Sequence, residues 1–224
     1  MERLLYADLK SWLQSPARQP MLLTGARQTG KTWLLQEFGR CEFRACHYLN
    51  FERGGPISRV FDGALSAKQL LAQIAIVLDA DISVEEDLLV LDEIQECPRA
   101  LTSLKYFSEE LPELAVCGAG SHLGLTLSSG SFPIGKVDWL RLYPLTFEEF
   151  LMAVKPRLAA LVSEFGDESV VPPAMHELLW EQLKAYYVTG GMPAVVSAFR
   201  QGQDDLAQAF RDVRELQSLL IQGY

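Results

Sequence analysis

The segment that most constrains the fold is Gly25-Ala26-Arg27-Gln28-Thr29-Gly30-Lys31-Thr32, in which a glycine and four further residues precede Gly-Lys-Thr. This spacing is typical of a phosphate-binding loop, or Walker A motif. The segment follows a short apolar run at residues 21–24 and precedes a helical pattern at residues 33–38, which we expect Gly39 to end. A strand, a loop and a helix in this order predict the first unit of an α/β sheet.

Each part of this loop has a chemical purpose. Gly25 and Gly30 permit backbone conformations that turn successive N–H groups toward phosphates, and the following helix presents its positive end to the same charge. Lys31 is expected to reach the β- and γ-phosphates, and the Thr32 hydroxyl to hold Mg²⁺. The predicted nucleotide-binding residues are Gly25, Ala26, Arg27, Gln28, Thr29, Gly30, Lys31, Thr32 and Trp33.

Strands and helices alternate along the next hundred residues. Strands are predicted at residues 45–51, 88–91 and 114–117 from their alternation or their apolar runs. Ser66-Ala67-Lys68-Gln69 has the form of a capping box for a helix reaching Val77 or Leu78, and Pro98 begins a helix that runs to about Leu111. The predicted fold class is therefore α/β, a parallel sheet sandwiched by helices with right-handed crossovers.

Two carboxylates, Asp92 and Glu93, follow the buried strand in the manner of a Walker B motif, at the sheet edge where ligands of open α/β proteins bind. Asp92 is expected to hold Mg²⁺ through water, and Glu93 to orient or deprotonate the attacking water. A solvated carboxylate pair is the alternative. Ser121 follows the next strand and is expected to sense the γ-phosphate, unless it only forms a turn. The predicted catalytic residues are thus Glu93, Lys31 and Ser121, and the metal ligands are Thr32 and Asp92.

The C-terminal third is predicted to be helical. Thr146-Phe147-Glu148-Glu149 forms a second capping box, and residues 204–221 have one apolar side that needs a partner, which favours a fragment of a longer chain. Residues 121–135, rich in Gly and Ser, are expected to form a mobile loop near the strand ends. We predict an ATPase core at residues 1–140 and a helical lid at residues 141–224.

Composition narrows the classes of function. Apolar residues make up 49% of the chain and charged residues 22%, which excludes a largely disordered protein. No apolar run approaches the ~20 residues of a membrane span, and no signal peptide is visible, so we expect a cytoplasmic protein. A net charge of −9 disfavours a broad nucleic-acid surface. The four cysteines and three histidines lack the spacing of a disulfide framework or a metal site.

The chain resembles the prokaryotic AAA-like ATPases, whose ATPase module is normally followed by a C-terminal domain of unknown function. The motifs that carry the resemblance are residues 25–32, Leu91-Asp92-Glu93-Ile94-Gln95, Leu142-Tyr143-Pro144-Leu145-Thr146-Phe147-Glu148-Glu149-Phe150 and Gly190-Gly191-Met192-Pro193. The resemblance implies an ATP-binding core with the additional strand of AAA-type proteins and a helical lid from about Thr146. Lys136 departs from the family, which often has an arginine there, and the C-terminal domain is not evident.

Two functions remain open from sequence. One is an ATPase that uses ATP and Mg²⁺; the other is a nucleotide-dependent switch with little turnover, whose helical region holds a protein partner or a second copy of the chain. Nucleic-acid remodelling rests on analogy alone, and the acidic composition counts against it. Arg27 and Arg53 are weaker candidates. Arg27 contacts either phosphate or an acidic neighbour, and an ion pair explains it equally well, whereas a solvated charge is the better explanation of Arg53.

Overall fold

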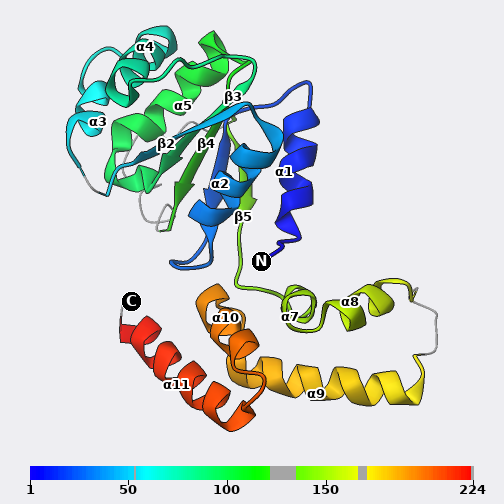
Figure 1. The fold of residues 1–224 in the computed structure, drawn as a ribbon. Coiled ribbons are helices and arrows are strands. Elements are labelled where there is room, and N and C mark those ends of the chain that lie inside the picture. Colours follow the sequence, from blue (N-terminus) through cyan, green and yellow to red (C-terminus); the bar gives the residue numbers. More distant parts are fainter. Residues whose placement is uncertain (53, 122–134, 166–170, 223–224) are drawn as a thin grey trace. The chain divides into compact units, whose positions relative to one another are not determined.

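The computed structural model describes residues 1–52, 54–121, 135–165 and 171–222 (Figure 1). They form two compact units. The core unit comprises Leu5–Ala26 and Gly30–Leu142, and the helical unit comprises Met1–Leu4, Arg27–Thr29 and Tyr143–Tyr224. Arg53 and residues 122–134, most of the predicted glycine- and serine-rich loop, lie outside the described residues.

The core unit is built on a parallel sheet, which confirms the predicted fold class. Its strands are β1 (Met21–Thr24), β2 (Ala45–Asn50), β3 (Asp87–Asp92), β4 (Ala115–Gly120) and β5 (Asp138–Arg141). They pair in the order β2-β3-β4-β1-β5, every pair parallel. Because Thr24 pairs with Gly120 and Asn50 with Asp92, the strands bring their carboxyl ends to one edge.

Strand β5 was not predicted from its own residues. Its four residues, Asp-Trp-Leu-Arg, alternate between half-buried and exposed positions, so the segment lacks the apolar run that marks the other strands. Pairing with β1 defines it: Met21 pairs with Asp138 and Thr24 with Arg141. A strand at the edge of a sheet needs less apolar surface than a central one.

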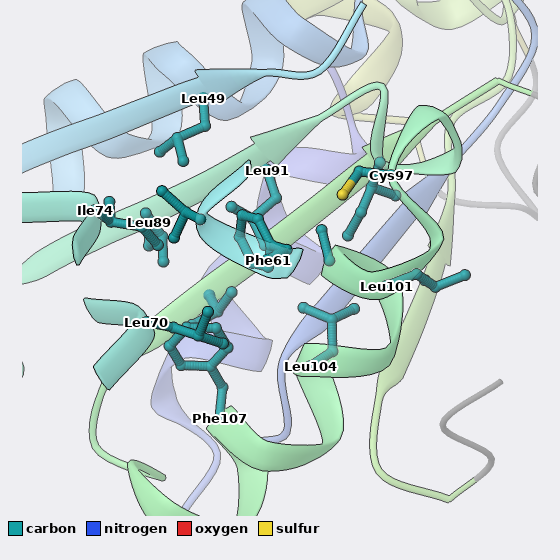
Figure 2. Packing of buried hydrophobic residues seen from close by; sticks show 14 of the residues in the cluster. Leu49, Phe61, Leu70, Ile74, Leu89, Leu91, Cys97, Leu101, Leu104 and Phe107 are labelled. Atoms are coloured by element: carbon teal, nitrogen blue, oxygen red, sulfur yellow. The ribbon is translucent and has the colours of Figure 1, made fainter. Parts of the chain in front are cut away.

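Helices cover both faces of the sheet. One face carries α1 (Leu5–Gln14) and α2 (Lys31–Glu42); the other carries α3 (Pro56–Arg59), α4 (Ala67–Leu78) and α5 (Pro98–Glu110), with 3₁₀ turns η1 (Val60–Asp62) and η2 (Ile94–Glu96) (Figure 1). The fully buried strand β3 serves both cores, because successive side chains of a strand point to opposite faces. Leu89 and Leu91 pack with Phe61 and the α4–α5 side chains (Figure 2), whereas Leu88 and Val90 pack with α1 and α2.

The prediction that Gly39 ends the second helix is wrong. Helix α2 continues through this glycine to Glu42. A Cβ atom at Gly39 would lie 2.5 Å from Sγ and 2.6 Å from Cβ of Cys46, and 3.2 Å from Leu88 Cδ2. The glycine is therefore required by the close approach of the helix to β2 and β3.

The predicted capping box at Ser66 is also wrong, although Ser66 does precede α4. Its side chain makes no capping hydrogen bond. The Glu110 carboxylate at the end of α5 accepts instead from both the Ala67 amide and the Ser66 hydroxyl, each at 2.9 Å. A carboxylate distant in the sequence thus satisfies a first-turn amide of α4, where the local capping hydrogen bonds are missing.

The helical unit contains α7 (Phe147–Val154), α8 (Pro156–Ser163), α9 (Pro173–Thr189), α10 (Pro193–Gln201) and α11 (Leu206–Gln222). The capping box at its first helix is confirmed, with both reciprocal hydrogen bonds between Thr146 and Glu149 present. Its core contains side chains from α7, α9, α10 and α11, among them Phe150, Val196 and Val213. Of the helices in the described ranges, none combines the length and apolar character needed to cross a membrane.

Candidate nucleotide site

The phosphate-binding loop has the backbone that its glycines predict. Gly30 has φ 92° and directly precedes α2, whose first turn has no side-chain cap. Gln28, at φ 62°, holds a left-handed conformation that costs a non-glycine residue of the order of 1 kcal/mol or more. An α-helix that begins in this way directs its first N–H groups and its positive end toward the loop, which suits an anion.

Lys31 is the buried cation of this loop. Only 5% of the residue is exposed. Its Nζ donates to the carbonyl oxygens of Gly25 at 2.9 Å and Ala26 at 2.8 Å. The ammonium group is therefore held against the loop backbone, where a phosphate approaching the same backbone would meet it.

Asp92 collects hydroxyl groups from two other elements at the carboxyl edge of the sheet. Thr32 Oγ1 on α2 and Tyr48 Oη on β2 both donate to Asp92 Oδ2 at 2.6 Å, while Oδ1 accepts from the Glu93 amide at 2.9 Å. Burial and the neighbouring Asp92 carboxylate raise the pKa of Tyr48 to about 12, so its phenol remains a donor at neutral pH. Hydroxyl and carboxylate oxygens are hard donors, and this set fits Mg²⁺.

Glu93 has a left-handed backbone, with φ 50°, which turns the chain immediately after β3. Its Oε2 accepts from Gln95 Nε2 at 2.6 Å and lies 3.4 Å from Ser121 Oγ. The predicted catalytic carboxylate and the predicted γ-phosphate sensor are thus neighbours at the ends of β3 and β4. Glu93 is also adjacent to the Asp92–Thr32 pair.

The other predicted residues are placed differently. Arg27, Gln28 and Thr29 group with the helical unit. Trp33 lies in the first turn of α2 with 45% of its surface exposed. Lys136 forms an ion pair with Glu109 at 3.3 Å.

Sequence reasoning missed two polar residues of this edge, Tyr48 and Gln95. Tyr48 also accepts a hydrogen bond from Asn50 Nδ2 at 3.0 Å. The one available signal was that residues 48 and 50 share a face of β2 and pair with β3 near Asp92. The hydrogen bond from Gln95 to Glu93 depends on the turn after β3, and no periodic pattern in the sequence predicts this turn.

The thiols do not form a second site. All four cysteines are unbridged, and burial raises the pKa of Cys46 to about 11, which keeps this thiol protonated. Among the residues that the structure describes, no cluster of three or more His, Cys, Asp or Glu side chains could hold a metal ion.

Comparison with known proteins identifies the fold and the family of the chain. The chain has the fold of PCH-2 from C. elegans (TM-score 0.58, 14% identity, covering 96% of this chain and 69% of that one). It also has the fold of AMPPCP-bound DnaA from Aquifex aeolicus (TM-score 0.52, 16% identity, covering 98% and 67%). No curated protein matches in sequence. The family model described as "AAA domain" matches residues 17–151, more than half of the chain. The chain is therefore a member of the AAA domain family, with the fold and nucleotide-binding character of an AAA-like P-loop ATPase.

Proposed function

We propose that this protein hydrolyses ATP in the presence of Mg²⁺. The observation that carries the proposal is the 2.6 Å hydrogen bond between Thr32 Oγ1 and Asp92 Oδ2, with Glu93 as the next residue. A hydroxyl from the phosphate-binding loop and a carboxylate from the carboxyl end of β3 thereby converge on one point. This is the arrangement needed to hold a hydrated cation against phosphate oxygens.

Each residue then has a definite task. Lys31 moves from the loop carbonyls to the β- and γ-phosphates, and the backbone amides of the loop bind the same oxygens. Bound Mg²⁺ neutralises charge on the phosphate oxygens. Glu93 accepts a proton from the water whose oxygen bonds to the γ-phosphorus, while the bond from this phosphorus to the β–γ bridging oxygen breaks and ADP leaves. Ser121 donates a hydrogen bond to the γ-phosphate.

The comparisons support a nucleotide ligand in general terms. One protein of the same fold is described as AMPPCP-bound, and the family is defined by the AAA domain. We extend this to ATP as substrate, and we assign residues 141–224 the role of a lid.

A switch with little turnover is the second candidate, and the contact between Gln95 and Glu93 favours it. The Glu93 carboxylate already accepts a hydrogen bond from the Gln95 amide at 2.6 Å, so this oxygen is restrained and less free to orient an attacking water. Exposed apolar side chains of the helical unit, including Trp180, Tyr187 and Ile221, would suit contact with another protein or a second copy of the chain.

ATP binding and phosphate release by the wild type, Lys31→Ala and Glu93→Gln separate these functions. For an ATPase, we expect Lys31→Ala to weaken ATP binding about 10- to 100-fold, the contribution of charge-assisted hydrogen bonds to phosphate. Glu93→Gln should bind ATP normally and lower kcat by about 10²- to 10⁴-fold. Binding is measured by isothermal titration calorimetry and turnover by phosphate release over a range of protein concentrations.

Matched controls are Lys68→Ala on α4 and Glu96→Gln on η2, both exposed. Neither substitution should change affinity or rate. Normal ATP binding without phosphate release at any protein concentration would favour the switch over the enzyme. Absence of ATP binding by the wild type would contradict both.

A further inference from the structure

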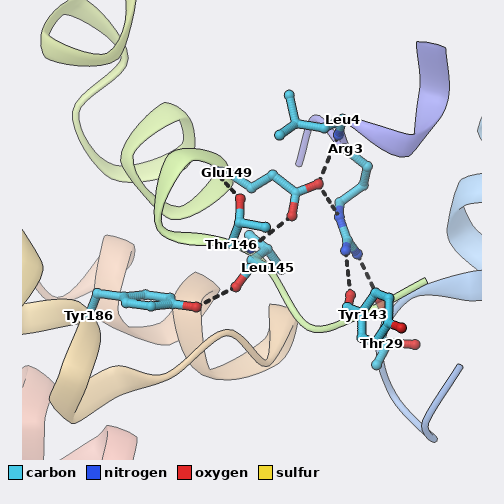
Figure 3. Close-up of polar contacts among 8 residues, drawn as sticks. All are labelled: Arg3, Leu4, Thr29, Tyr143, Leu145, Thr146, Glu149 and Tyr186. Carbon is cyan, nitrogen blue, oxygen red and sulfur yellow. Dashed lines mark hydrogen bonds and ion pairs between the residues drawn. The ribbon is translucent and has the colours of Figure 1, made fainter. Parts of the chain in front are cut away.

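Arg3 is a buried arginine that the nucleotide chemistry above does not use. It belongs to the helical unit, and 4% of its side chain is exposed, as is 4% of the Glu149 side chain with which it pairs. Its Nε donates to Glu149 Oε1 at 3.0 Å (Figure 3). Burying both members of an ion pair carries a desolvation cost that their attraction often only offsets, so stability alone is a weak reason for the pair.

The remaining guanidinium nitrogens are bonded to backbone. Nη1 donates to the Thr29 carbonyl at 2.7 Å, and Nη2 donates to the Tyr143 carbonyl at 2.6 Å. Thr29 lies in the middle of the phosphate-binding loop and is fully buried. A planar guanidinium can serve three acceptors in fixed directions, which a lysine cannot do.

Glu149 connects this arginine to the start of α7. Its Oε1 also accepts from the Leu4 amide at 2.8 Å, and its Oε2 accepts from the Thr146 amide at 2.9 Å as part of the capping box. One carboxylate therefore caps the helix and orients Arg3. The position of the loop at Thr29 and the cap of α7 depend on the same two side chains.

From this geometry we infer that Arg3 is a positioning residue that links the phosphate-binding loop at Arg27–Thr29 to helix α7. The inference rests on the proposed nucleotide site and adds to it a route by which occupancy of the loop at residues 27–29 reaches helix α7 within the same unit. Nucleotide that orders the loop stabilises the hydrogen bonds that connect Thr29, Arg3 and Glu149, and with them the first turn of α7. By linkage, loss of these hydrogen bonds weakens nucleotide binding.

The test is hydrogen exchange of the full chain with and without Mg·ATP, combined with ATP affinity, for the wild type and Arg3→Lys. Lysine keeps the charge but not the three-way geometry. Without nucleotide, we expect Arg3→Lys to exchange faster at residues 27–29 and in α7. With nucleotide, α7 should gain protection in the wild type only, and Arg3→Lys should bind ATP about tenfold more weakly, the effect of one charge-assisted hydrogen bond.

Arg44→Lys is the matched control, because Arg44 makes a two-pronged contact with the buried Asp87 in the core unit. It should keep the affinity and the α7 response. If Arg3→Lys lowers the Tm but keeps the wild-type ATP affinity and the protection of α7 by nucleotide, the inference is overturned while the ATP function stands. If the wild type binds no ATP, the proposed function fails, and exchange at residues 27–29 without nucleotide still decides whether Arg3 holds the loop. Should Arg3→Lys not fold, Glu149→Gln must show the same changes.

Discussion

At the scale of single residues, Tyr48 is well suited to a test, because a single hydroxyl group makes its contact with Asp92. Tyr48→Phe removes only the hydroxyl that donates to Asp92 Oδ2. Partners that orient a metal-binding carboxylate typically contribute 10- to 100-fold to metal affinity. We expect the Mg²⁺ concentration for half-maximal activity to rise about tenfold, with little change in ATP binding without Mg²⁺.

Tyr6→Phe provides the control for this change. Tyr6 Oη also donates to a carboxylate, Glu42 Oε1 at 2.8 Å, but on the α1–α2 surface. Its loss should leave the Mg²⁺ dependence unaltered. An unchanged Mg²⁺ titration for Tyr48→Phe would mean that Thr32 and the backbone alone orient Asp92.

At the scale of elements, the packing of α2 on the sheet depends on Gly39. Replacing a mid-helix glycine by alanine ordinarily stabilises a helix by about 1 kcal/mol. Here the added methyl group would overlap Cys46 on β2, and overpacking of this kind costs about 1–3 kcal/mol. We therefore expect Gly39→Ala to lower the free energy of unfolding by about 1–2 kcal/mol, measured by urea denaturation.

Gly63→Ala is the comparison, since a Cβ at Gly63 meets no atom within 4 Å. It should change the free energy of unfolding by less than about 0.5 kcal/mol. A Gly39→Ala variant as stable as the wild type would show that α2 can move away from β2 at little cost.

At the scale of the whole molecule, stability in acid depends on a network around Asp87. Arg44, and then His47 and the Ser83 amide, donate hydrogen bonds that hold the pKa of Asp87 well below its usual range. A carboxylate with a lowered folded-state pKa contributes stability that is present above its unfolded pKa, about 3.9, and is lost as the pH falls toward the folded value. The free energy of unfolding should therefore decline below about pH 4, even though acid reduces the net charge of −9.

Asp87→Asn should be less stable at neutral pH, because Arg44 and His47 lose a charged partner, and its stability should fall less steeply between about pH 4 and 2. Asp8→Asn, at an exposed position on α1, should keep the wild-type slope. Denaturant unfolding at several pH values measures both. Equal slopes for Asp87→Asn and the wild type would place the acid sensitivity elsewhere.

The sequence by itself determined the features whose signals are local. The glycine spacing of residues 25–32 and the apolar runs of β1, β3 and β4 predicted the parallel sheet, and the pattern at Thr146 and Glu149 predicted the capping box of α7. Each of these signals lies within a few consecutive residues, so a short stretch of sequence is enough to recognise it. The catalytic, nucleotide and metal roles assigned to residues 25–33, Asp92, Glu93 and Ser121 stay predictions until they are measured.

Tertiary structure alone decided the features whose partners are distant in the chain. Gly39 serves the approach of β2 rather than the end of a helix, Glu110 caps α4 from another helix, and β5 exists because it pairs with β1. Arg3 contacts Glu149 across 146 positions of sequence. No periodic pattern encodes such contacts, because each depends on a directional hydrogen bond or a close packing distance that arises only after the elements have come together.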